Sequence, residues 1–599
     1  MVVGARLAMS EFDPPLEEIR FALHVVSRLG GKTPYVGTTD SNDVLTAAAR
    51  FAQDAFLPLN GAGDREGCRF EDGRVTTPTG FKKAYASYVQ AGWNGAGIPV
   101  QLGGQGLPFS IALAVSEIFN ASNISLAMGL MPSAGAVELI NRFGTERQRE
   151  TYLPRLVSGE WTVTMALTEP QAGSDLGAIQ TRAVRDGDSF VLKGQKTFIT
   201  WGEHDLSENI VHLVLARSPD GLSGTKGLSL YIVPKRCIVD GELGEPNDVI
   251  CSGIEKKIGL RGSPTTSLVF GERGGAKAEL LGVENRGLEQ MFILMNQARL
   301  KVAAFALGSA ERAYQAASKY AQFRVQGRDT AGRPSQIAKH PDVTRMLTSM
   351  EARTAAIRLI TLYAASLVDA AKTGEDKNDD LSAHQRLELL TPVIKAWCTE
   401  AAFDVSSLGM QVFGGIGYSE DCEASQHFRE SRVHMIYEGT TGVQANDLIF
   451  RKVRRDGGAS AERLFCVIES SCQSTKIGVP SEFLGVVTRI ECALKYLRTL
   501  TNWIVRQPNS ETAALQFNGA HYLMLFGTVL ASWLSLAAAK SSLSLQDADT
   551  FKARKLQNAR FLAEQFLPPA MALAGVIMTA DNEAWPQPDQ TSDLMSERA

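Results

Sequence analysis

The sequence predicts a mostly α-helical protein with one inserted β domain and a further helical domain at its C-terminus. Apolar residues recur at spacings of three and four before about residue 160 and again after about residue 280, as is typical of amphipathic helices. Short β-rich runs separated by turn residues lie between these two regions. A linker-like break at Asp456–Ser460 precedes a last apolar, helical stretch.

The length of the chain indicates more than one structural unit. With 599 residues, the chain exceeds what one hydrophobic core usually organises. The patterns divide it into an N-terminal extension, a helical domain, the β domain, a second helical domain and a C-terminal helical domain, at residues 1–40, 41–160, 161–280, 281–456 and 461–599.

Each domain follows from its own pattern. In the first helical domain, Leu45–Phe56 and Ile111–Leu139 show helical spacing. Helical spacing returns at Val283–Ala364 and Thr391–Val412. The β domain is predicted from runs between turns at Trp161–Leu167, Ser189–Leu192, Lys196–Thr200, Ile210–Ala216 and Leu228–Val233.

One stretch in the C-terminal domain leaves two interpretations open. Tyr522–Ala539 runs 18 residues without a charge, near the lower limit for a membrane span. Thr528, Ser532 and Ser535 interrupt it at helical spacing, which favours a helix buried among other helices over membrane contact. We expect the whole domain to be an added helical layer or a dimerisation surface.

Composition and charge argue against a nucleic-acid partner. Hydrophobic residues make up 44% and charged residues 21% of the chain, as in globular proteins. The 61 Lys and Arg against 65 Asp and Glu leave a net charge of −4, and no run of like charge is long enough to bind a phosphate backbone. Residues 461–599 carry 12 basic and 13 acidic residues and therefore have no basic face.

Cysteine usage and the N-terminus predict a cytoplasmic protein. The eight cysteines form no CxxC pair and no regular spacing, so we expect reduced thiols and no zinc cluster or other metal site. Met1–Arg20 lacks the apolar stretch of roughly 7–15 residues of a secretory signal.

Several common catalytic and nucleotide-binding motifs are absent from the sequence. Gly31-Lys32-Thr33 resembles the end of a phosphate-binding loop, but Val26 stands where that loop needs glycine, so we expect an ordinary loop. No GxGxxG follows a predicted strand, and neither a GxSxG elbow nor an HExxH helix is present. Rossmann, hydrolase and metalloprotease functions lose support.

Two segments of the β domain could bind a flat polar ring. The loop Leu167–Asp175 offers two hydroxyls, an accessible backbone and a proline-fixed bend, although an ordinary turn explains it equally. In Lys196–Thr200, Phe198 and Thr200 point to one face because strand side chains alternate. An aromatic ring and a hydroxyl could cover a heterocycle there. The structural alternative is that both residues simply belong to an ordinary strand of the sheet.

Three later segments each have a structural and a functional interpretation. Ala321–Arg328 is a helix end whose cations suit the helix dipole or bind an anion. Gln411–Gly417 packs glycines that stop a helix or let a ligand approach the backbone. Glu438 lies between an apolar run and a Gly-Thr-Thr-Gly loop, where partial burial would raise its pKa as a general base requires. The alternative is a helix-start glutamate.

Taken in order, these segments resemble the acyl-CoA dehydrogenase family. The similarity covers about Phe51–Val453 and is carried by LTEPQAGSD, KTFIT, RVQG, QVFGGIG and IYEGTTG. The Pro15–Phe21 start, Lys257–Pro264 and the extra helical domain resemble a long subgroup of this family that includes 3-methylmercaptopropionyl-CoA dehydrogenase. The resemblance implies an α-domain, a β-domain, an α-bundle and an appended helical domain, with FAD bound noncovalently in a homodimer or homotetramer.

The resemblance also implies site residues, position by position. Met165, Leu167, Thr168 and Ser174 would line the flavin and the thioester, and Phe198 and Thr200 would cover the isoalloxazine ring. Arg324 and Gln326 would contact the FAD of a neighbouring subunit, and Gln411, Gly414 and Gly415 would contact the adenine and pyrophosphate of that FAD. Thr440 would complete the site. The residues implied to contact the substrate are Ser174, Asn296, Arg299 and Gly439.

Glu438 takes the place of the family's catalytic base. It would remove the α-proton of an acyl-CoA while the β-hydrogen leaves as hydride to the flavin, giving a trans-2-enoyl-CoA. The backbone N–H of residue 438 and a ribityl hydroxyl would polarise the thioester carbonyl. Some family members carry the base on an earlier helix, where this chain has Ala298. An electron-transferring flavoprotein would accept the electrons.

Two positions depart from the family pattern. His340-Pro341 stands where many relatives have Phe-Gln near the flavin, and Asn296 replaces an aspartate near CoA. Two other functions stay open at this point: a flavin acyl-CoA oxidase, and a DNA-binding flavoprotein of the same fold, against which the charge balance argues. The acyl group, a fatty acyl chain or 3-methylmercaptopropionyl, depends on pocket shape.

Overall fold

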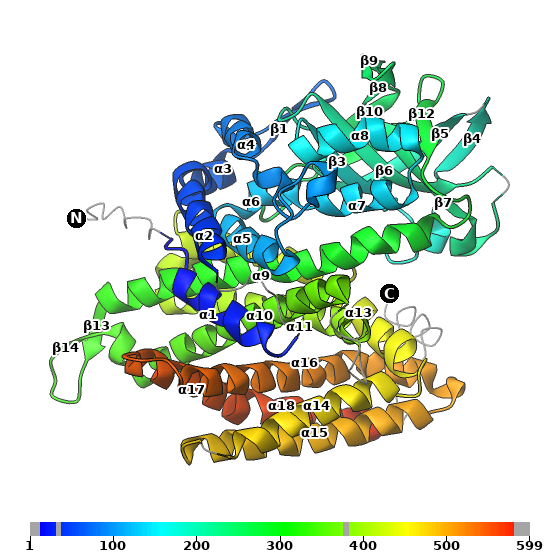
Figure 1. Cartoon of the computed structure of the whole chain (residues 1–599). Helices are drawn as coiled ribbons and strands as arrows, with labels where there is room; N and C mark the ends of the chain where they lie inside the picture. Colours follow the sequence, from blue (N-terminus) through cyan, green and yellow to red (C-terminus); the bar gives the residue numbers. More distant parts are fainter. Residues whose placement is uncertain are drawn as a thin grey trace, which may run out of the picture. The chain divides into compact units, whose positions relative to one another are not determined.

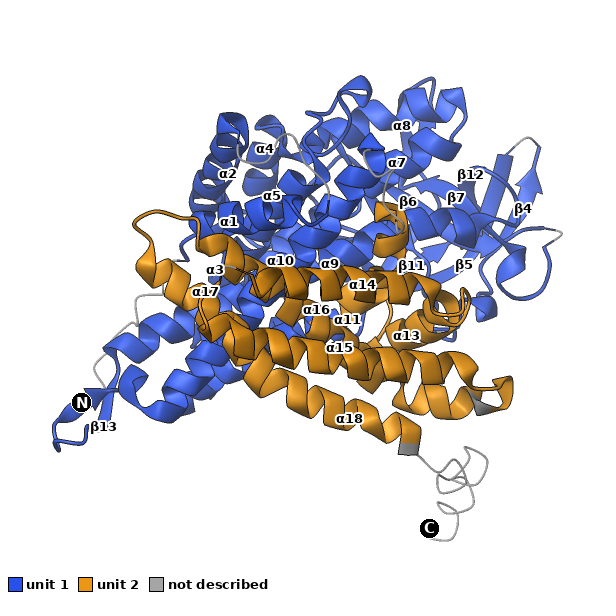
Figure 2. Ribbon diagram, turned by 60° about the horizontal axis from the view of Figure 1, so that its bottom comes forward, with its two compact units in different colours: residues 1–376, 398–438 blue, residues 377–397, 439–599 orange. Residues whose placement is uncertain are grey.

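The computed structural model of the protein describes residues 12–30, 38–187, 189–219, 221–374, 382–477 and 479–579. The chain forms two compact units (Figure 2). The first contains residues 1–376 and 398–438, and the second contains residues 377–397 and 439–599. The predicted loop at Gly31-Lys32-Thr33 lies outside the described residues.

The sheet of the first unit holds the strands that the sequence analysis singled out (Figure 1). Its strand order is β10-β11-β5-β12-β7-β6-β3, with β4 paired to β5 and β6. β3 and β6 run parallel, whereas the other main pairings are antiparallel. The strands are β3 (Trp161–Ala166), β4 (Arg182–Asp186), β5 (Ser189–Thr200), β6 (Asn209–Arg217), β7 (Leu228–Pro234), β10 (Val249–Ile254), β11 (Thr265–Phe270) and β12 (Ala276–Leu280).

A β-bulge interrupts β5 within the predicted ring-covering segment. Ile199 pairs with Thr266 and Lys196 with Leu268, so β5 carries one residue more than β11 across this stretch. Phe198, inside the bulge, has a φ of 56°, which a bulky residue adopts at a cost of about 1–3 kcal/mol. Such strain is concentrated at functional positions in proteins.

Helices precede the sheet along the chain. They are α1 (Leu16–Ser27), α2 (Thr39–Phe51), α3 (Asn60–Glu66), α4 (Phe81–Gln90), α5 (Phe109–Ser122), α6 (Ile124–Ala127), the short turn η5 (Met128–Leu130), α7 (Ser133–Phe143) and α8 (Glu146–Ser158). The helical prediction missed one hairpin, β1 (Arg69–Glu71) with β2 (Arg74–Thr76). A second small hairpin pairs β8 (Arg236–Val239) with β9 (Glu242–Pro246).

Two long helices, α9 (Gly287–Phe323) and α10 (Pro341–Thr373), pack with α5 in the first unit. The Asp369 carboxylate of α10 accepts hydrogen bonds from the backbone N–H groups of Phe109 and Ser110, at 2.7 and 3.0 Å. It thereby satisfies the free amide groups at the start of α5. This contact fixes the start of α5, where Phe109 lines the cavity described below.

Shorter elements follow these long helices in the first unit. The hairpin β13 (Val325–Arg328) with β14 (Pro334–Gln336) follows α9. After α11 (Ala383–Phe413) come the turn η9 (Gly414–Tyr418), α12 (Glu423–Ser431) and the turn η10 (Arg432–Met435).

The second unit is helical throughout the part that the structure describes. After α13 (Thr441–Asn446) it contains α14 (Ala459–Thr475), α15 (Glu482–Arg506), α16 (Thr512–Ser542), α17 (Asp549–Phe561) and α18 (Leu567–Thr579). The charge-free stretch Tyr522–Ala539 lies in α16, and 89% of the most apolar window of that helix is buried. The stretch is therefore a buried helix.

Hydropathy alone does not separate this helix from a membrane span. Among the described residues, four helical stretches have the length and apolar composition to cross a membrane. For three of them more than three quarters of the apolar window is buried, whereas the fourth, Asp549–Met578, buries 28%.

Candidate active site

Two predicted ring-binding segments lie side by side in the sheet domain. The Thr197 N–H donates to the Thr168 carbonyl at 2.9 Å, and Lys196 Nζ donates to the Leu167 carbonyl at 2.8 Å. Ile199 is buried, whereas Phe198 beside it is 61% exposed. An exposed aromatic ring, on a residue with a strained backbone, thus stands next to the polar loop.

A buried ion pair holds these two segments together. Lys196 Nζ lies 2.8 Å from Glu169 Oε1, and both side chains are almost fully buried. Glu169 also accepts from the backbone N–H groups of Gln180 and Thr181. Burial disfavours the Glu169 charge, but Lys196 and these hydrogen bonds outweigh it and lower the pKa of Glu169 to about 2. Burial lowers the pKa of Lys196 to about 8.

We expect Glu169→Gln to destabilise the protein by about 1.5–3 kcal/mol at pH 7, because a charged hydrogen-bond acceptor is lost. The folded-state pKa of about 2 lies below the unfolded value of about 4.3. The carboxylate therefore stabilises the fold above about pH 4.3, and this contribution disappears as the pH falls toward 2. Urea unfolding from pH 7 to pH 3.5 measures the difference.

The control for this prediction is Glu160→Gln, whose surface partner is Arg155. This substitution should cost at most about 1 kcal/mol. A wild-type advantage over Glu169→Gln that grows as the pH falls below 4.3 would contradict the assignment.

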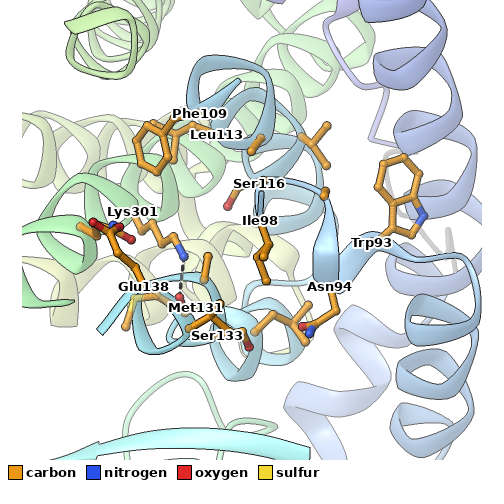
Figure 3. A pocket seen from close by; sticks show the side chains of 18 of the residues that line it. Trp93, Asn94, Ile98, Phe109, Leu113, Ser116, Met131, Ser133, Glu138 and Lys301 are labelled. Carbon is orange, nitrogen blue, oxygen red and sulfur yellow. Dashed lines mark hydrogen bonds between the residues drawn. The ribbon is translucent and has the colours of Figure 1, made fainter. Parts of the chain in front are cut away.

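A cavity of about 350 Å³ lies among the helices of the first unit (Figure 3). Its wall comes from the loop at residues 93–102, from α5, from η5 and the start of α7, and from the middle of α9. Most of these side chains are apolar, as in pockets for small molecules. The polar exceptions on α7 and α9 are Ser133, Glu138, Asn141, Gln297 and Lys301.

The segment that carries Glu438 contacts a residue of the cavity wall. Phe305, which lines the cavity, stacks on His434 with ring centroids 6.5 Å apart. His434 Nδ1 lies 2.9 Å from the Tyr437 hydroxyl, and its Nε2 lies 3.2 Å from the Ser309 hydroxyl. Burial and then the Glu438 charge raise the pKa of Tyr437. Glu438 itself does not line the cavity.

The strand β5 approaches the same cavity from another side. A Cβ added at Gly129 would lie 2.9 Å from the ring of Trp201, which follows β5 directly. Leu130 and Met131, next to Gly129, line the cavity. The end of the Phe198 strand and the segment that leads to Glu438 therefore each pack against a residue that lines or adjoins the cavity.

The backbone around Glu438 has an unusual conformation. Glu438 is half-buried with a φ of 55°, and Gly439 has a φ of 93°. The left-handed region is costly for glutamate and free for glycine. Lys395 Nζ donates to the Gly439 carbonyl at 2.6 Å, and the Thr440 hydroxyl caps α13 by accepting from the Val443 N–H. These contacts fix the chain directly after Glu438.

The structure places the remaining predicted residues in two other groups. Arg324 and Gln326 are exposed where the β13–β14 hairpin leaves α9, away from the sheet (Figure 1). Tyr320 of α9 stacks on Phe413 at 4.3 Å, which brings Gln411, Gly414 and Gly415 to that same end of α9. Within one chain, this group does not join the Leu167–Thr200 segments.

The other group lies on α9. Arg299 Nη1 lies 3.4 Å from Asn296 Oδ1, and Ala298 between them is buried. His340, which departs from the family pattern, donates a 2.7 Å hydrogen bond from Nε2 to the Gln326 carbonyl. It therefore helps to hold the β13–β14 hairpin.

The sequence analysis missed the polar residues inside the cavity. Lys301 stands in the apolar run Leu300–Leu307 of α9. A single cation within such a run is the sequence feature that could have indicated a polar residue inside a cavity. Gln297 and Glu138 are hydrogen-bonded to each other across α9 and α7. Nothing in the local sequence predicts that pair.

Comparison with known proteins decides the family. Models of the acyl-CoA dehydrogenase N-terminal, middle and C-terminal domains match residues 38–160, 164–272 and 285–452. A model described as acetyl-CoA dehydrogenase C-terminal like matches residues 465–586. The chain is 37% identical over 570 residues to 3-methylmercaptopropionyl-CoA dehydrogenase of Ruegeria pomeroyi, covering 93% of this chain and 96% of that protein. The chain belongs to the acyl-CoA dehydrogenase family.

Solved structures agree with the fold of this acyl-CoA dehydrogenase. ACDH-11 of Caenorhabditis elegans, in complex with C11-CoA, superposes with a TM-score of 0.76 over 98% of both chains at 22% identity. An acyl-CoA dehydrogenase of Bacillus anthracis, complexed with FAD, gives a TM-score of 0.73 at 20% identity over 94% of this chain and 92% of that one. The predicted family, fold class and enzyme class, an oxidoreductase acting on CH–CH groups, are confirmed.

Proposed function

We propose that this acyl-CoA dehydrogenase binds FAD and oxidises an acyl-CoA thioester to the trans-2-enoyl-CoA, with Glu438 as the base. One observation carries the proposal. Residues that line or adjoin a mainly apolar cavity pack against both the end of the strand that presents Phe198 and the segment that leads to Glu438. An acyl chain in that cavity would place its first carbons between these two positions.

The residues at the proposed flavin site fit a flat, polar cofactor. Phe198 offers an exposed ring, and the half-buried Thr168 and Thr200 offer hydroxyls beside it. A Cβ added at Gly414 or Gly415 would meet no atom within 4 Å, so the backbone there is open to a ligand. We assign Met165, Leu167 and Ser174 to the same ring, and Arg324, Gln326 and Gln411 to the FAD of a second subunit in a homodimer or homotetramer.

In this proposal FAD supplies the hydride acceptor. The Glu438 carboxylate takes the α-proton, and its half-buried position beside half-buried Tyr437 limits the water around this base. The backbone N–H of residue 438 donates to the thioester oxygen, where negative charge develops. Lys395 steadies the chain at Gly439. We assign Thr440 to this end of the site, and Asn296 and Arg299 of α9 to contacts with CoA.

The test is anaerobic reduction with a panel of thioesters. The purified protein should show the absorption of bound FAD and bleach when mixed with its substrate in the absence of oxygen. Linear acyl-CoAs of three to sixteen carbons and 3-methylmercaptopropionyl-CoA form the panel, because the Ruegeria relative is named for the latter. A protein that binds FAD but is bleached by no acyl-CoA would contradict the proposal.

The electron acceptor is tested in the same preparation. We propose that an electron-transferring flavoprotein reoxidises the enzyme faster than air does. Rapid formation of hydrogen peroxide in air would instead identify an acyl-CoA oxidase, which shares the proton and hydride steps.

A further inference from the structure

We infer that Lys301 binds the far end of the acyl group, and that the enzyme therefore favours acyl-CoAs whose tail carries a hydrogen-bond-accepting oxygen. This inference rests on the proposed function, since it assumes that an acyl chain enters the cavity. It adds to the proposed function the chemical class of the acyl tail, which the fold alone does not specify.

Lys301 presents its amino group to the cavity. The side chain belongs to α9 and lines the cavity wall (Figure 3). Its Nζ donates to the Met131 carbonyl at 2.6 Å. A lysine ammonium has three donors, and among the described residues no other hydrogen bond from Lys301 is present. Two donors are therefore available to a ligand.

Lys301 also has no counter-ion among the residues described. No carboxylate lies within ion-pair distance of its Nζ there, and the nearby cavity residue Glu138 accepts a hydrogen bond from Gln297 instead. Burial lowers the pKa of Lys301 to about 8. The residue nevertheless keeps part of its surface accessible, as expected of a side chain that faces a cavity.

The two remaining donors of Lys301 lie in a mainly apolar cavity, where they are unfavourable unless a ligand accepts hydrogen bonds from them. When a ligand displaces water from the cavity, each donor that is left without an acceptor loses its hydration and gains nothing in return. An alkyl tail would leave both free donors facing methylene groups, whereas a ketone, hydroxyl or carboxylate oxygen would satisfy one of them. Sites built around a buried donor discriminate strongly against ligands that lack the acceptor.

The experiment compares matched acyl-CoAs on the wild type and on Lys301→Met. Methionine has a similar length and no donor. Each pair has the same chain length, from four to ten carbons: a straight acyl chain, and the chain with a penultimate ketone or a terminal carboxylate. The ratio of kcat/KM within each pair is the measured quantity. Lys319→Met, on the same helix outside the cavity, is the control.

We expect the wild type to favour an oxygen-bearing tail by about tenfold or more at one chain length, because a site with an unpaired donor discriminates against ligands that lack the acceptor. Lys301→Met should lose this preference and gain on straight chains, and Lys319→Met should keep it. A preference for the ketone as well as the carboxylate indicates hydrogen bonding, and a preference for the carboxylate alone indicates charge pairing; either supports the inference.

A second readout does not depend on turnover. Dissociation constants of the same pairs, measured by calorimetry on Glu438→Gln with and without Lys301→Met, should show the same change of preference. Equal ratios in the wild type and Lys301→Met, with both proteins folded, would overturn the role of Lys301. Absence of turnover with every acyl-CoA would overturn the proposed function instead.

Discussion

Glu438→Gln is expected to lower kcat by about 10²–10⁴-fold while the protein keeps its bound FAD, because the substitution removes a proton acceptor and preserves the side-chain shape. The half-buried residue lies at a left-handed backbone position beside Tyr437. Glutamine occupies the same space there. Single-turnover flavin bleaching under anaerobic conditions measures the chemical step directly.

Two further measurements separate chemistry from folding in this variant. The FAD absorption spectrum and the melting temperature should stay close to the wild type. Glu420→Gln, an exposed glutamate paired with Arg261, should retain full turnover. Bleaching of Glu438→Gln at the wild-type rate would exclude Glu438 as the base.

The largest loss of stability is expected from Arg358→Met. Arg358 of α10 bonds Glu117 of α5 at 2.7 Å and Glu311 of α9 at 2.6 Å, and all three side chains are buried. Burial disfavours the guanidinium charge, but the two carboxylates outweigh it and raise the pKa of Arg358. Burial raises the pKa of Glu117. Removing the cation leaves two carboxylates buried without it, at a cost of about 3–5 kcal/mol.

The control for this prediction lies on the same helix. Arg345 pairs with Asp342 at the surface, so Arg345→Met should cost at most about 1 kcal/mol. Adding Glu117→Gln and Glu311→Gln to Arg358→Met should restore part of the lost stability, because no buried charge then remains. Urea unfolding measures all four proteins. Equal midpoints for Arg358→Met and Arg345→Met would show that the network contributes little.

The alternation of helical and strand regions could be predicted because each has its own periodicity. The hairpin at Arg69–Thr76 was missed, although Asp72-Gly73 is a turn signal, because its strands have three residues each. The bulge at Phe198 depends on how β5 pairs with β11. A strand's own sequence does not contain that register.

The site was predictable only in part. Motif resemblance singled out Glu438 and Phe198, but their assigned roles stay predictions. The partnership of Lys196 with Glu169 joins residues 27 positions apart, and Lys301 meets Met131 across 170 positions. Such contacts arise from packing between helices and strands, for which local periodicity gives no signal.

The paired left-handed residues at 438 and 439 limit what mutagenesis can teach at the base position. Aspartate and asparagine tolerate such a conformation, whereas β-branched residues resist it. A randomised library at position 438 would therefore be sorted first by backbone tolerance and only then by acidity. Inactive valine, isoleucine or threonine clones would report a distorted loop, and only glutamine, aspartate and asparagine clones would report on proton transfer.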